Sequence, residues 1–227
     1  MAGVVILAAC SSSTTTTSTT SPTTTTQVPD SVGGPASTGT TTVTDGSVVA
    51  GRSTAAAAGV PRQFEVVQGD TKQVVNIDRM ITTRGACHLR SAADAHALPD
   101  PTCTPGVIAA RVNQANIKQT ICVPGYTTGV RPSASATDRV KQLNYVAYAQ
   151  TQNPLDENDH LVPLELGGAN DPRNLWNQPP APGQTSRTNA KDQVENTLHS
   201  LVCTGRLKLA DAQRLIAIDW ATALNGR

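Results

Sequence analysis

The chain has 227 residues, a formal net charge of +1 and few aromatic residues: one Phe, two Trp and three Tyr. This length allows one compact domain with appendages, whose core must be built mainly from Val, Leu, Ile and Ala. The near-neutral charge excludes a strongly basic DNA-coating protein. Because no run of about 18 or more apolar residues occurs, we expect no transmembrane helix.

The first ten residues contain a short apolar run that ends in Leu7-Ala8-Ala9-Cys10. This ending resembles the bacterial lipobox, in which the cysteine receives lipid and becomes the first residue of the mature protein. The resemblance implies an exported protein that is anchored to the membrane through Cys10. A secretory signal also has a basic start and an apolar stretch of about 7 to 15 residues, and residues 1–10 lack both. Either the true start lies upstream or the match is accidental, and we favour the first.

Residues 11–60 are expected to form a disordered linker between this signal and the folded part. From Ser11 to Thr42 the sequence is mostly Ser, Thr, Pro and Gly, with one charge at Asp30. Such a segment cannot bury enough apolar surface to offset the entropy cost of ordering its backbone. It therefore predicts a tether.

Four further cysteines fall in the region expected to fold, namely Cys87, Cys103, Cys122 and Cys203. They form no C-x-x-C pair, which argues against a zinc knuckle and favours two disulfides in an oxidising compartment. Three pairings are possible, and the spacing does not choose among them. The alternative is four buried free thiols in a cytosolic protein.

Residues 61–102 predict an accessory β-rich region, with two brief strands between Phe64 and Met80 and a loop at 98–106 pinned by Cys103. Residues 103–227 predict the main domain. A short helix is expected over 113–119, and a longer one runs to about Gln150 from an approximate capping box at Ser135 and Asp138.

The next segment predicts two strands followed by two helices. Stretches 159–166 and 174–176 flank a Gly167-Gly168 turn, which favours a two-stranded ribbon. Apolar residues at helical spacing predict a helix over 189–202, stopped by Thr204-Gly205, and a last helix over 209–224. The expected fold class is α+β: a small strand-strand-helix core with flanking helices, stapled by disulfides.

Residues 159–189 contain a spaced pattern: Asp-His, two residues, Pro-Leu, two residues, Gly-Gly, five residues, Asn-Leu, thirteen residues, Asn. This pattern resembles the HNH (ββα-metal) nuclease family. The string Asn189-Ala190-Lys191-Asp192, followed by Glu195, is similar to the helix of actinobacterial secreted proteins described as HNH endonucleases. The likeness extends from about Cys103 to Trp220.

The resemblance implies a role for each matching position. Asp159 and Asn189 would bind one divalent metal ion, His160 would be the base, and Asn174 would bond across the ribbon to hold the loop and the His160 ring. Oxygen ligands suit Mg²⁺, with Mn²⁺ as the alternative. The metal would neutralise the phosphodiester while a neutral imidazole deprotonates water. Arg187 or Lys191 would hold a phosphate oxygen.

Other polar residues have simpler interpretations. Asn189 also fits a helix N-cap. Glu195 and His199 are expected to be an exposed pair four residues apart, outside the site. We expect His88 and His96 to be solvated and both tryptophans, Trp176 and Trp220, to lie in the core.

The sequence predicts an exported, metal-dependent endonuclease with little sequence specificity, acting as a monomer on DNA or, alternatively, on RNA. From Cys103 onward twelve Lys and Arg face ten Asp and Glu, so nonspecific affinity should be modest and sensitive to salt. The main alternative is a non-catalytic lipoprotein of the cell envelope that uses the same scaffold for binding. A hydrolase for a wall polymer is a weaker option, because no paired catalytic carboxylates can be picked out.

Overall fold

A computed structural model describes residues 63–91, 96–186 and 189–227, all of which belong to one compact unit. Within these ranges the chain combines helices with short strands, so the predicted α+β content is confirmed. The predictions for Cys10, for the linker at 11–60 and for Arg187 lie outside the described residues.

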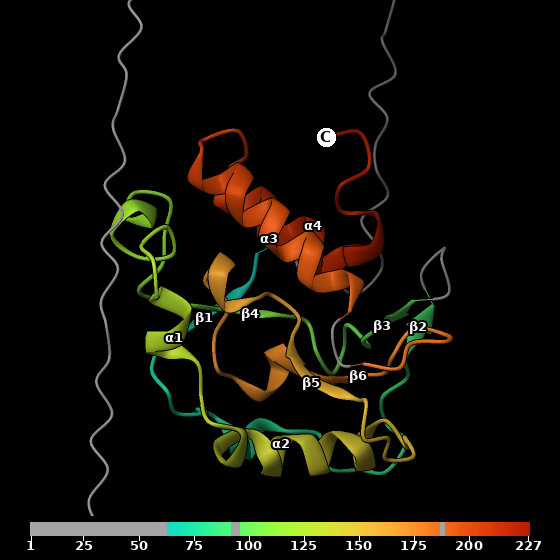
Figure 1. The fold of residues 1–227 in the computed structure, drawn as a ribbon. Helices are drawn as coiled ribbons and strands as arrows, with labels where there is room; N and C mark the ends of the chain where they lie inside the picture. Colours follow the sequence, from blue (N-terminus) through green and yellow to red (C-terminus); the bar gives the residue numbers. More distant parts are fainter. Residues whose placement is uncertain (1–62, 92–95, 187–188) are drawn as a thin grey trace, which may run out of the picture. The chain divides into compact units, whose positions relative to one another are not determined.

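The described elements follow the chain in a simple order (Figure 1). The strands are β1 (Glu65–Val67), β2 (Arg90–Ser91), β3 (Ala97–Leu98), β4 (Val107–Ala109), β5 (Glu157–His160) and β6 (Leu175–Gln178). The α-helices are α1 (Tyr126–Val130), α2 (Ala134–Ala147), α3 (Ala190–Cys203) and α4 (Leu209–Asp219). Short 3₁₀ helices are Ile77–Arg79, Ile117–Gln119, Leu164–Leu166, Pro172–Asn174 and Trp220–Thr222.

The strands form three two-stranded sheets: β1 with β4 in parallel, and β2 with β3 and β5 with β6 antiparallel. In the β5–β6 ribbon, Glu157 lies opposite Gln178 and His160 opposite Leu175. Helix α2 lies on one side of this ribbon, while α3 and α4 pack together on the other (Figure 1). The ribbon is thus the middle layer.

Helix α3 begins and ends where the sequence predicts. Asn189 is its N-cap: the side-chain oxygen accepts from the Lys191 N–H, and Asp192 completes a capping box. The helix ends at Cys203 with Thr204 as its C-cap, and Gly205 then takes a positive φ of 76° that favours glycine. These two signals are local, which explains why the sequence predicts both ends.

Other predicted elements differ from those observed. Only one strand, β1, forms between Phe64 and Met80, because Asn76 adopts a left-handed conformation and starts a 3₁₀ helix. The helix expected over 113–119 shrinks to the 3₁₀ helix Ile117–Gln119, because the side chains of Asn113 and Asn116 bond the local backbone instead.

Helix α2 is shorter than predicted and is capped by a different serine. Ser133, not Ser135, caps it by accepting from the Ala136 N–H at 3.2 Å. The helix stops at Ala147, and Ala149 has a positive φ of 47°. A left-handed residue at this point prevents the helix from reaching Gln150.

One main hydrophobic core joins residues from both regions that the sequence predicts. Both tryptophans are buried in it, as expected. Residues from before and after position 103 contribute, among them Leu98, Ile117, Leu161, Trp176, Leu198, Val202, Ile216 and Trp220. The accessory segment therefore packs on the same core as the ribbon and α3.

The predicted pairs of cysteines are both disulfides, and the structure selects one of the three possible pairings. Cys87 bonds Cys103 across 16 residues, and Cys122 bonds Cys203 across 81 residues. The second disulfide ties the end of α3 to the segment before α1. Two disulfides indicate an oxidising compartment. In the described ranges, no helix is both long and apolar enough to cross a membrane.

Removing the longer disulfide should cost more stability than removing the shorter one. Loop-closure entropy predicts losses of about 4.5 kcal/mol for the Cys122→Ser, Cys203→Ser double variant and about 3 kcal/mol for Cys87→Ser, Cys103→Ser. Urea unfolding of both variants beside the wild type measures the difference. Equal losses, or a larger loss for the shorter loop, would contradict this ranking.

Candidate functional site

The loop between β5 and β6 is held by the side-chain amide of Asn174, which is fully buried. Its Oδ1 accepts from the Val162 N–H at 2.9 Å, and its Nδ2 donates to the carbonyls of Val162 at 2.9 Å and Ala169 at 3.0 Å. Gly168 is essential to this close packing, because a Cβ there would lie 1.8 Å from the Val162 oxygen. Asn174 thus bonds across the ribbon and fixes the loop that follows His160.

Side chains along β5 alternate between the two faces of the ribbon. Glu157 and Asp159 face α3, where they contact Asn189 and Lys191. Asn158 faces α2, and His160 lies on the same face. The adjacent residues Asp159 and His160 therefore point in opposite directions.

The imidazole of His160 is buried and held by Asn170. The His160 Nε2 lies 2.8 Å from Asn170 Oδ1, while Asn170 Nδ2 donates to the carbonyls of Thr71 and Val130. Because the amide nitrogen already serves two acceptors, its oxygen must accept, so His160 Nε2 carries the proton. The other ring nitrogen, Nδ1, then carries no proton and keeps its lone pair.

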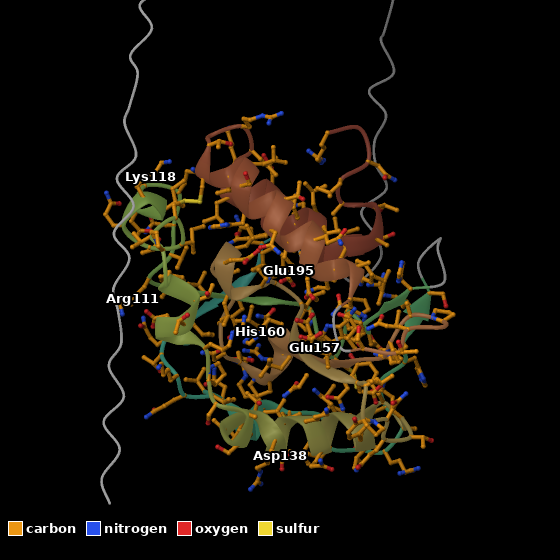
Figure 2. The ribbon with its side chains drawn as sticks, in the orientation of Figure 1. Arg111, Lys118, Asp138, Glu157, His160 and Glu195 are labelled. Atoms are coloured by element: carbon orange, nitrogen blue, oxygen red, sulfur yellow. A yellow bond between two sulfur atoms is a disulfide. The ribbon has the colours of Figure 1, made fainter. Side chains whose placement is uncertain are left out.

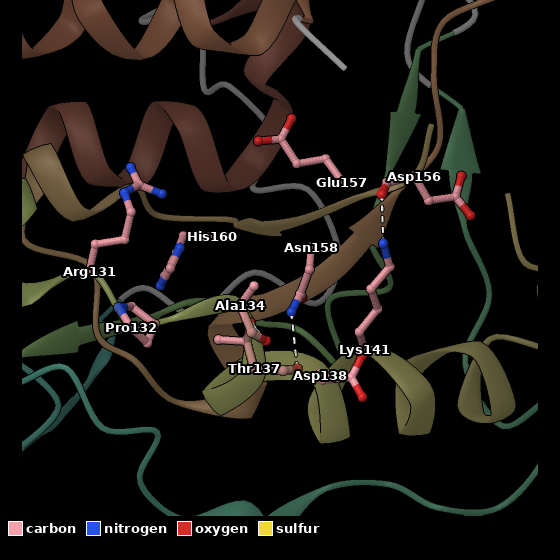
Figure 3. A pocket seen from close by; sticks show the side chains of 10 residues that line it. All are labelled: Arg131, Pro132, Ala134, Thr137, Asp138, Lys141, Asp156, Glu157, Asn158 and His160. Carbon is pink, nitrogen blue, oxygen red and sulfur yellow. Dashed lines mark hydrogen bonds between the residues drawn. The ribbon is translucent and has the colours of Figure 1, made fainter. Parts of the chain in front are cut away.

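His160 borders a pocket of about 390 Å³ between β5 and the start of α2 (Figure 3). The pocket contains two cations, Arg131 and Lys141; Arg131 is exposed, while the Lys141 ammonium donates to the Asp156 carbonyl. Figure 3 shows Arg131 beside the His160 ring. The residues that line the pocket are Arg131, Pro132, Ala134, Thr137, Asp138, Lys141, Asp156, Glu157, Asn158 and His160.

Burial lowers the pKa of His160 from 6.5 to about 4, although its bond to Asn170 and the charge of Asp159 oppose the shift. Arg131 and Lys191 lower it further. At neutral pH the ring is therefore uncharged and able to accept a proton.

On the α3 face, Lys191 is completely buried and lies between two carboxylates. Its ammonium is 2.7 Å from Asp159 Oδ2, forms an ion pair with Glu195 and donates to the His160 carbonyl at 2.8 Å. The side chain of Lys191 is 1% exposed. Figure 2 shows Glu195 on α3 above Glu157 and His160.

These buried charges shift one another's pKa. Burial alone would lower the pKa of Lys191, but the charges of Asp159 and Glu195 outweigh burial and raise it. Burial raises the pKa of Glu195 to about 8 in spite of Lys191, and Asp159 adds to the shift. Lys191 therefore keeps its charge at neutral pH, and the carboxyl group of Glu195 ionises less readily than that of an exposed glutamate.

Burial also raises the pKa of Glu157 to about 7, with the charges of Asp159 and Asp192 adding to the effect. Its carboxylate accepts from Asn189 Nδ2 at 2.6 Å. An acidic residue that ionises near neutral pH thus lies between the pocket and α3.

The two metal ligands that the resemblance implies, Asp159 and Asn189, do not fit this arrangement. The Asp159 carboxylate already contacts the Lys191 ammonium, and the Asn189 oxygen caps α3 by accepting the Lys191 N–H at 2.8 Å. Asn189 therefore fills the N-cap role that the sequence also predicts. Carboxylate oxygens that could bind a hard cation are present, but the Lys191 ammonium already contacts those of Asp159 and Glu195.

The structure brings Asp159, Asn189 and Lys191 together on the α3 face of the ribbon. The His160 ring and the loop held by Asn174 lie apart from them. Lys191 has a different role from the predicted one, because its buried ammonium is not available to a phosphate oxygen. Asn174 holds the loop, but Asn170 holds the His160 ring.

Sequence reasoning missed Asn170, Arg131, Glu157 and the role of Glu195. Glu157 precedes Asp159 by two residues and Glu195 follows Lys191 by four, so strand and helix periods could have found both. No local signal marks Asn170 or Arg131, because their approach to His160 depends on tertiary packing.

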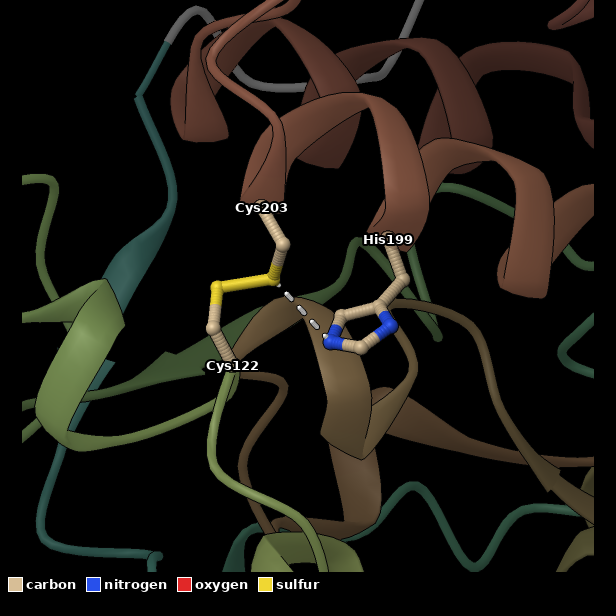
Figure 4. Close-up of side chains that lie close together, drawn as sticks. All are labelled: Cys122, His199 and Cys203. Carbon is tan, nitrogen blue, oxygen red and sulfur yellow. Dashed lines mark hydrogen bonds between the residues drawn. A yellow bond between two sulfur atoms is a disulfide. The ribbon is translucent and has the colours of Figure 1, made fainter. Parts of the chain in front are cut away.

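A second group of potential ligands lies at the far end of α3. Ligand atoms of Cys122, His199 and Cys203 lie within 4.8 Å of one another, so these residues could hold a metal ion (Figure 4). The two sulfur atoms form a disulfide, and thiolates, which bind metals, would exist only after reduction.

The histidine predictions need correction at two positions. His199 is half-buried, with its Nε2 2.8 Å from the Ile121 carbonyl, and is not part of an exposed pair with Glu195. His96 is half-buried against Trp220, with ring centroids 4.6 Å apart. His88 is exposed, as predicted.

No known family model, curated protein or solved structure matches this chain. Membership of the HNH family stays a prediction from residues 159–189.

Gly168→Ala should destabilise the protein strongly, because the added Cβ would lie 1.8 Å from the Val162 oxygen and 2.9 Å from Asn174 Nδ2. We expect a loss of about 2 kcal/mol or more, measured by urea unfolding. Gly129→Ala is the control: nothing lies within 4 Å of its Cβ, and it stands in helix α1. Similar losses of stability in the two variants would contradict the close packing of Gly168 against Val162 and Asn174.

Glu195→Gln should remove a pH dependence of stability. The folded state keeps the Glu195 proton up to about pH 8, whereas the ordinary pKa is 4.5, so the wild type loses stability as pH rises between these values. The variant should become more stable relative to the wild type by up to about 1.4 kcal/mol per pH unit. Urea unfolding of both proteins from about pH 5 to pH 9 measures this. A constant difference across that range would contradict the raised pKa.

Proposed function

We propose that this chain is an exported endonuclease that hydrolyses phosphodiester bonds of nucleic acid with little sequence specificity, with His160 as its base. The observation that carries the proposal is the buried, neutral His160 ring, whose Nε2 is committed to Asn170 and whose ring borders a pocket with Arg131. The spacing of residues 159–189, which resembles that of HNH nucleases, agrees with it.

In the proposed reaction the lone pair of His160 Nδ1 takes a proton from a water molecule. The water oxygen forms a bond to phosphorus, and the bond from phosphorus to the bridging oxygen breaks. That oxygen leaves as an alkoxide and takes a proton from solvent. The resemblance implies that the products carry a 3′ hydroxyl and a 5′ phosphate.

Arg131 would bind the phosphate in the pocket beside His160. A guanidinium can donate two parallel hydrogen bonds to phosphate oxygens and neutralises part of their charge. A bound phosphodiester would also raise the pKa of His160 toward neutrality, because a nearby negative charge favours the protonated ring. The low pKa of the free protein therefore does not prevent general-base catalysis.

The substrate is DNA, with RNA as the alternative, and the protein acts as a monomer. The near-neutral charge favours modest, salt-sensitive binding of the phosphate backbone. Export and a lipid anchor at Cys10 rest on the lipobox-like ending and the Ser/Thr-rich linker. The two disulfides agree with a place outside the cytoplasm.

A second candidate is a non-catalytic module of the cell envelope that uses the ribbon and α3 as a scaffold. It is favoured by one observation: the implied metal ligand Asp159 is paired with the buried Lys191. A scaffold that has lost its metal would keep its fold and its cap at Asn189. The two candidates differ in whether the protein cleaves nucleic acid.

The deciding experiment is cleavage of plasmid DNA and of RNA by the oxidised full chain, with Mg²⁺, Mn²⁺ or EDTA. His160→Ala should lower the cleavage rate by about 10²- to 10⁴-fold, the usual contribution of a general base. The control is His88→Ala, the same substitution at an exposed histidine, which should cleave like the wild type.

Circular dichroism and a thermal melt would establish that each variant is folded. If a folded wild type cuts neither substrate, the endonuclease proposal fails and the binding module is favoured. If His160→Ala cuts as fast as His88→Ala, cleavage comes from another site or from a contaminant.

A further inference from the structure

We infer that Lys191 is a built-in cation: its ammonium group, held between Asp159 and Glu195, occupies the Asp159 carboxylate that the implied divalent metal ion would need. The chain then binds no metal ion through Asp159, and any hydrolysis at His160 proceeds without one there. The second statement rests on the proposed endonuclease function, whereas the first does not.

The surroundings of the Lys191 ammonium carry the inference. Three oxygen atoms lie around it, from the Asp159 carboxylate, the Glu195 carboxylate and the His160 carbonyl. The ammonium donates to the Glu195 carboxylate and to the His160 carbonyl, and it forms an ion pair with Asp159 Oδ2 at 2.7 Å. Because the side chain is buried, this ammonium does not face a phosphate in solution.

A metal ion would compete for the same oxygen atoms. Mg²⁺ needs ligands at about 2.1 Å in octahedral geometry, so an ion bound to Asp159 Oδ2 would lie close to the ammonium that contacts the same oxygen at 2.7 Å, and the two positive groups would repel each other. Metal binding would therefore expel the ammonium. Lys191 is fully buried in the first turn of α3, with its backbone N–H bonded to Asn189, so expulsion would leave a packed helix end without its core side chain.

Lys191 also contacts the strand residue that carries the proposed base. Its ammonium donates to the backbone carbonyl of His160 at 2.8 Å, on the face opposite the ring. It is thus a positioning residue that fixes the end of β5, while Arg131 and Lys141 are the cations that line the pocket. The positive charges of the site are supplied by side chains on both faces of the ribbon.

The first test is Mn²⁺ binding to the oxidised full chain, by titration calorimetry and by loss of the electron paramagnetic resonance signal of free Mn²⁺. Wild type and Asp159→Asn should give the same result, because Asp159 is not a ligand. A Mn²⁺ site in the wild type that Asp159→Asn abolishes would overturn the inference.

The second test creates the metal site by removing the built-in cation. Lys191→Met keeps the length of the side chain and leaves Asp159 and Glu195 without a partner, so it should bind Mn²⁺ at least tenfold more tightly than the wild type. Adding Asp159→Asn should abolish this gain. Lys208→Met, the same change at an exposed lysine, should leave binding unchanged. A folded Lys191→Met variant with no gain would count against the inference, and if it does not fold, the wild-type comparison decides.

Cleavage assays separate this inference from the proposed function. Cleavage that persists in EDTA and disappears in His160→Ala supports both. Cleavage that needs a metal, together with a Mn²⁺ site lost in Asp159→Asn, overturns the inference but keeps the endonuclease. No cleavage by a folded protein overturns the endonuclease, and the Mn²⁺ titration still decides the role of Lys191.

Discussion

The buried amide of Asn174 is the contact on which the candidate site depends. It pairs with the backbone of Val162 and with the carbonyl of Ala169, and so closes the loop between β5 and β6. This closed loop brings Asn170 against the His160 ring, and Gly168 permits it because a side chain there would collide with the Val162 carbonyl. Without the clamp, neither the tautomer of His160 nor its pocket would be defined.

The sequence predicts those features that short-range chemistry determines. Helix α3 has Asn189 as its N-cap and ends before Thr204-Gly205, as expected, because capping residues act on their own neighbours. The strand after Val67 was predicted from alternating residues and is absent, because Asn76 leaves the extended conformation and Val75 bonds Asn170 instead. The pairing of the cysteines also needed the structure, because spacing leaves three choices.

The candidate site also contains residues that the sequence predicts and one, Lys191, whose role it does not predict. His160 and Asn174 were identified from spacing, and their bonds to Asn170 and Val162 involve residues only 10 to 12 positions away. The role of Lys191 was not predicted, because exposed and buried lysines look alike in a sequence. Burial of a charge becomes visible only when Asp159 and Glu195 are seen to surround it.

Side chains alternate along β5, so the two adjacent residues of the Asp-His motif lie on opposite faces of the ribbon. The predicted metal ligand and the predicted base are therefore separated. Asp159 and His160 are neighbours in sequence, yet one side chain faces α3 and the other faces the pocket by Arg131. A cation at Asp159 therefore contacts the His160 backbone and not its ring, whereas a phosphate beside the ring is met from the α2 side. The positive charges that line the pocket are thus those of Arg131 and Lys141, and the buried ammonium of Lys191 supports the strand from behind.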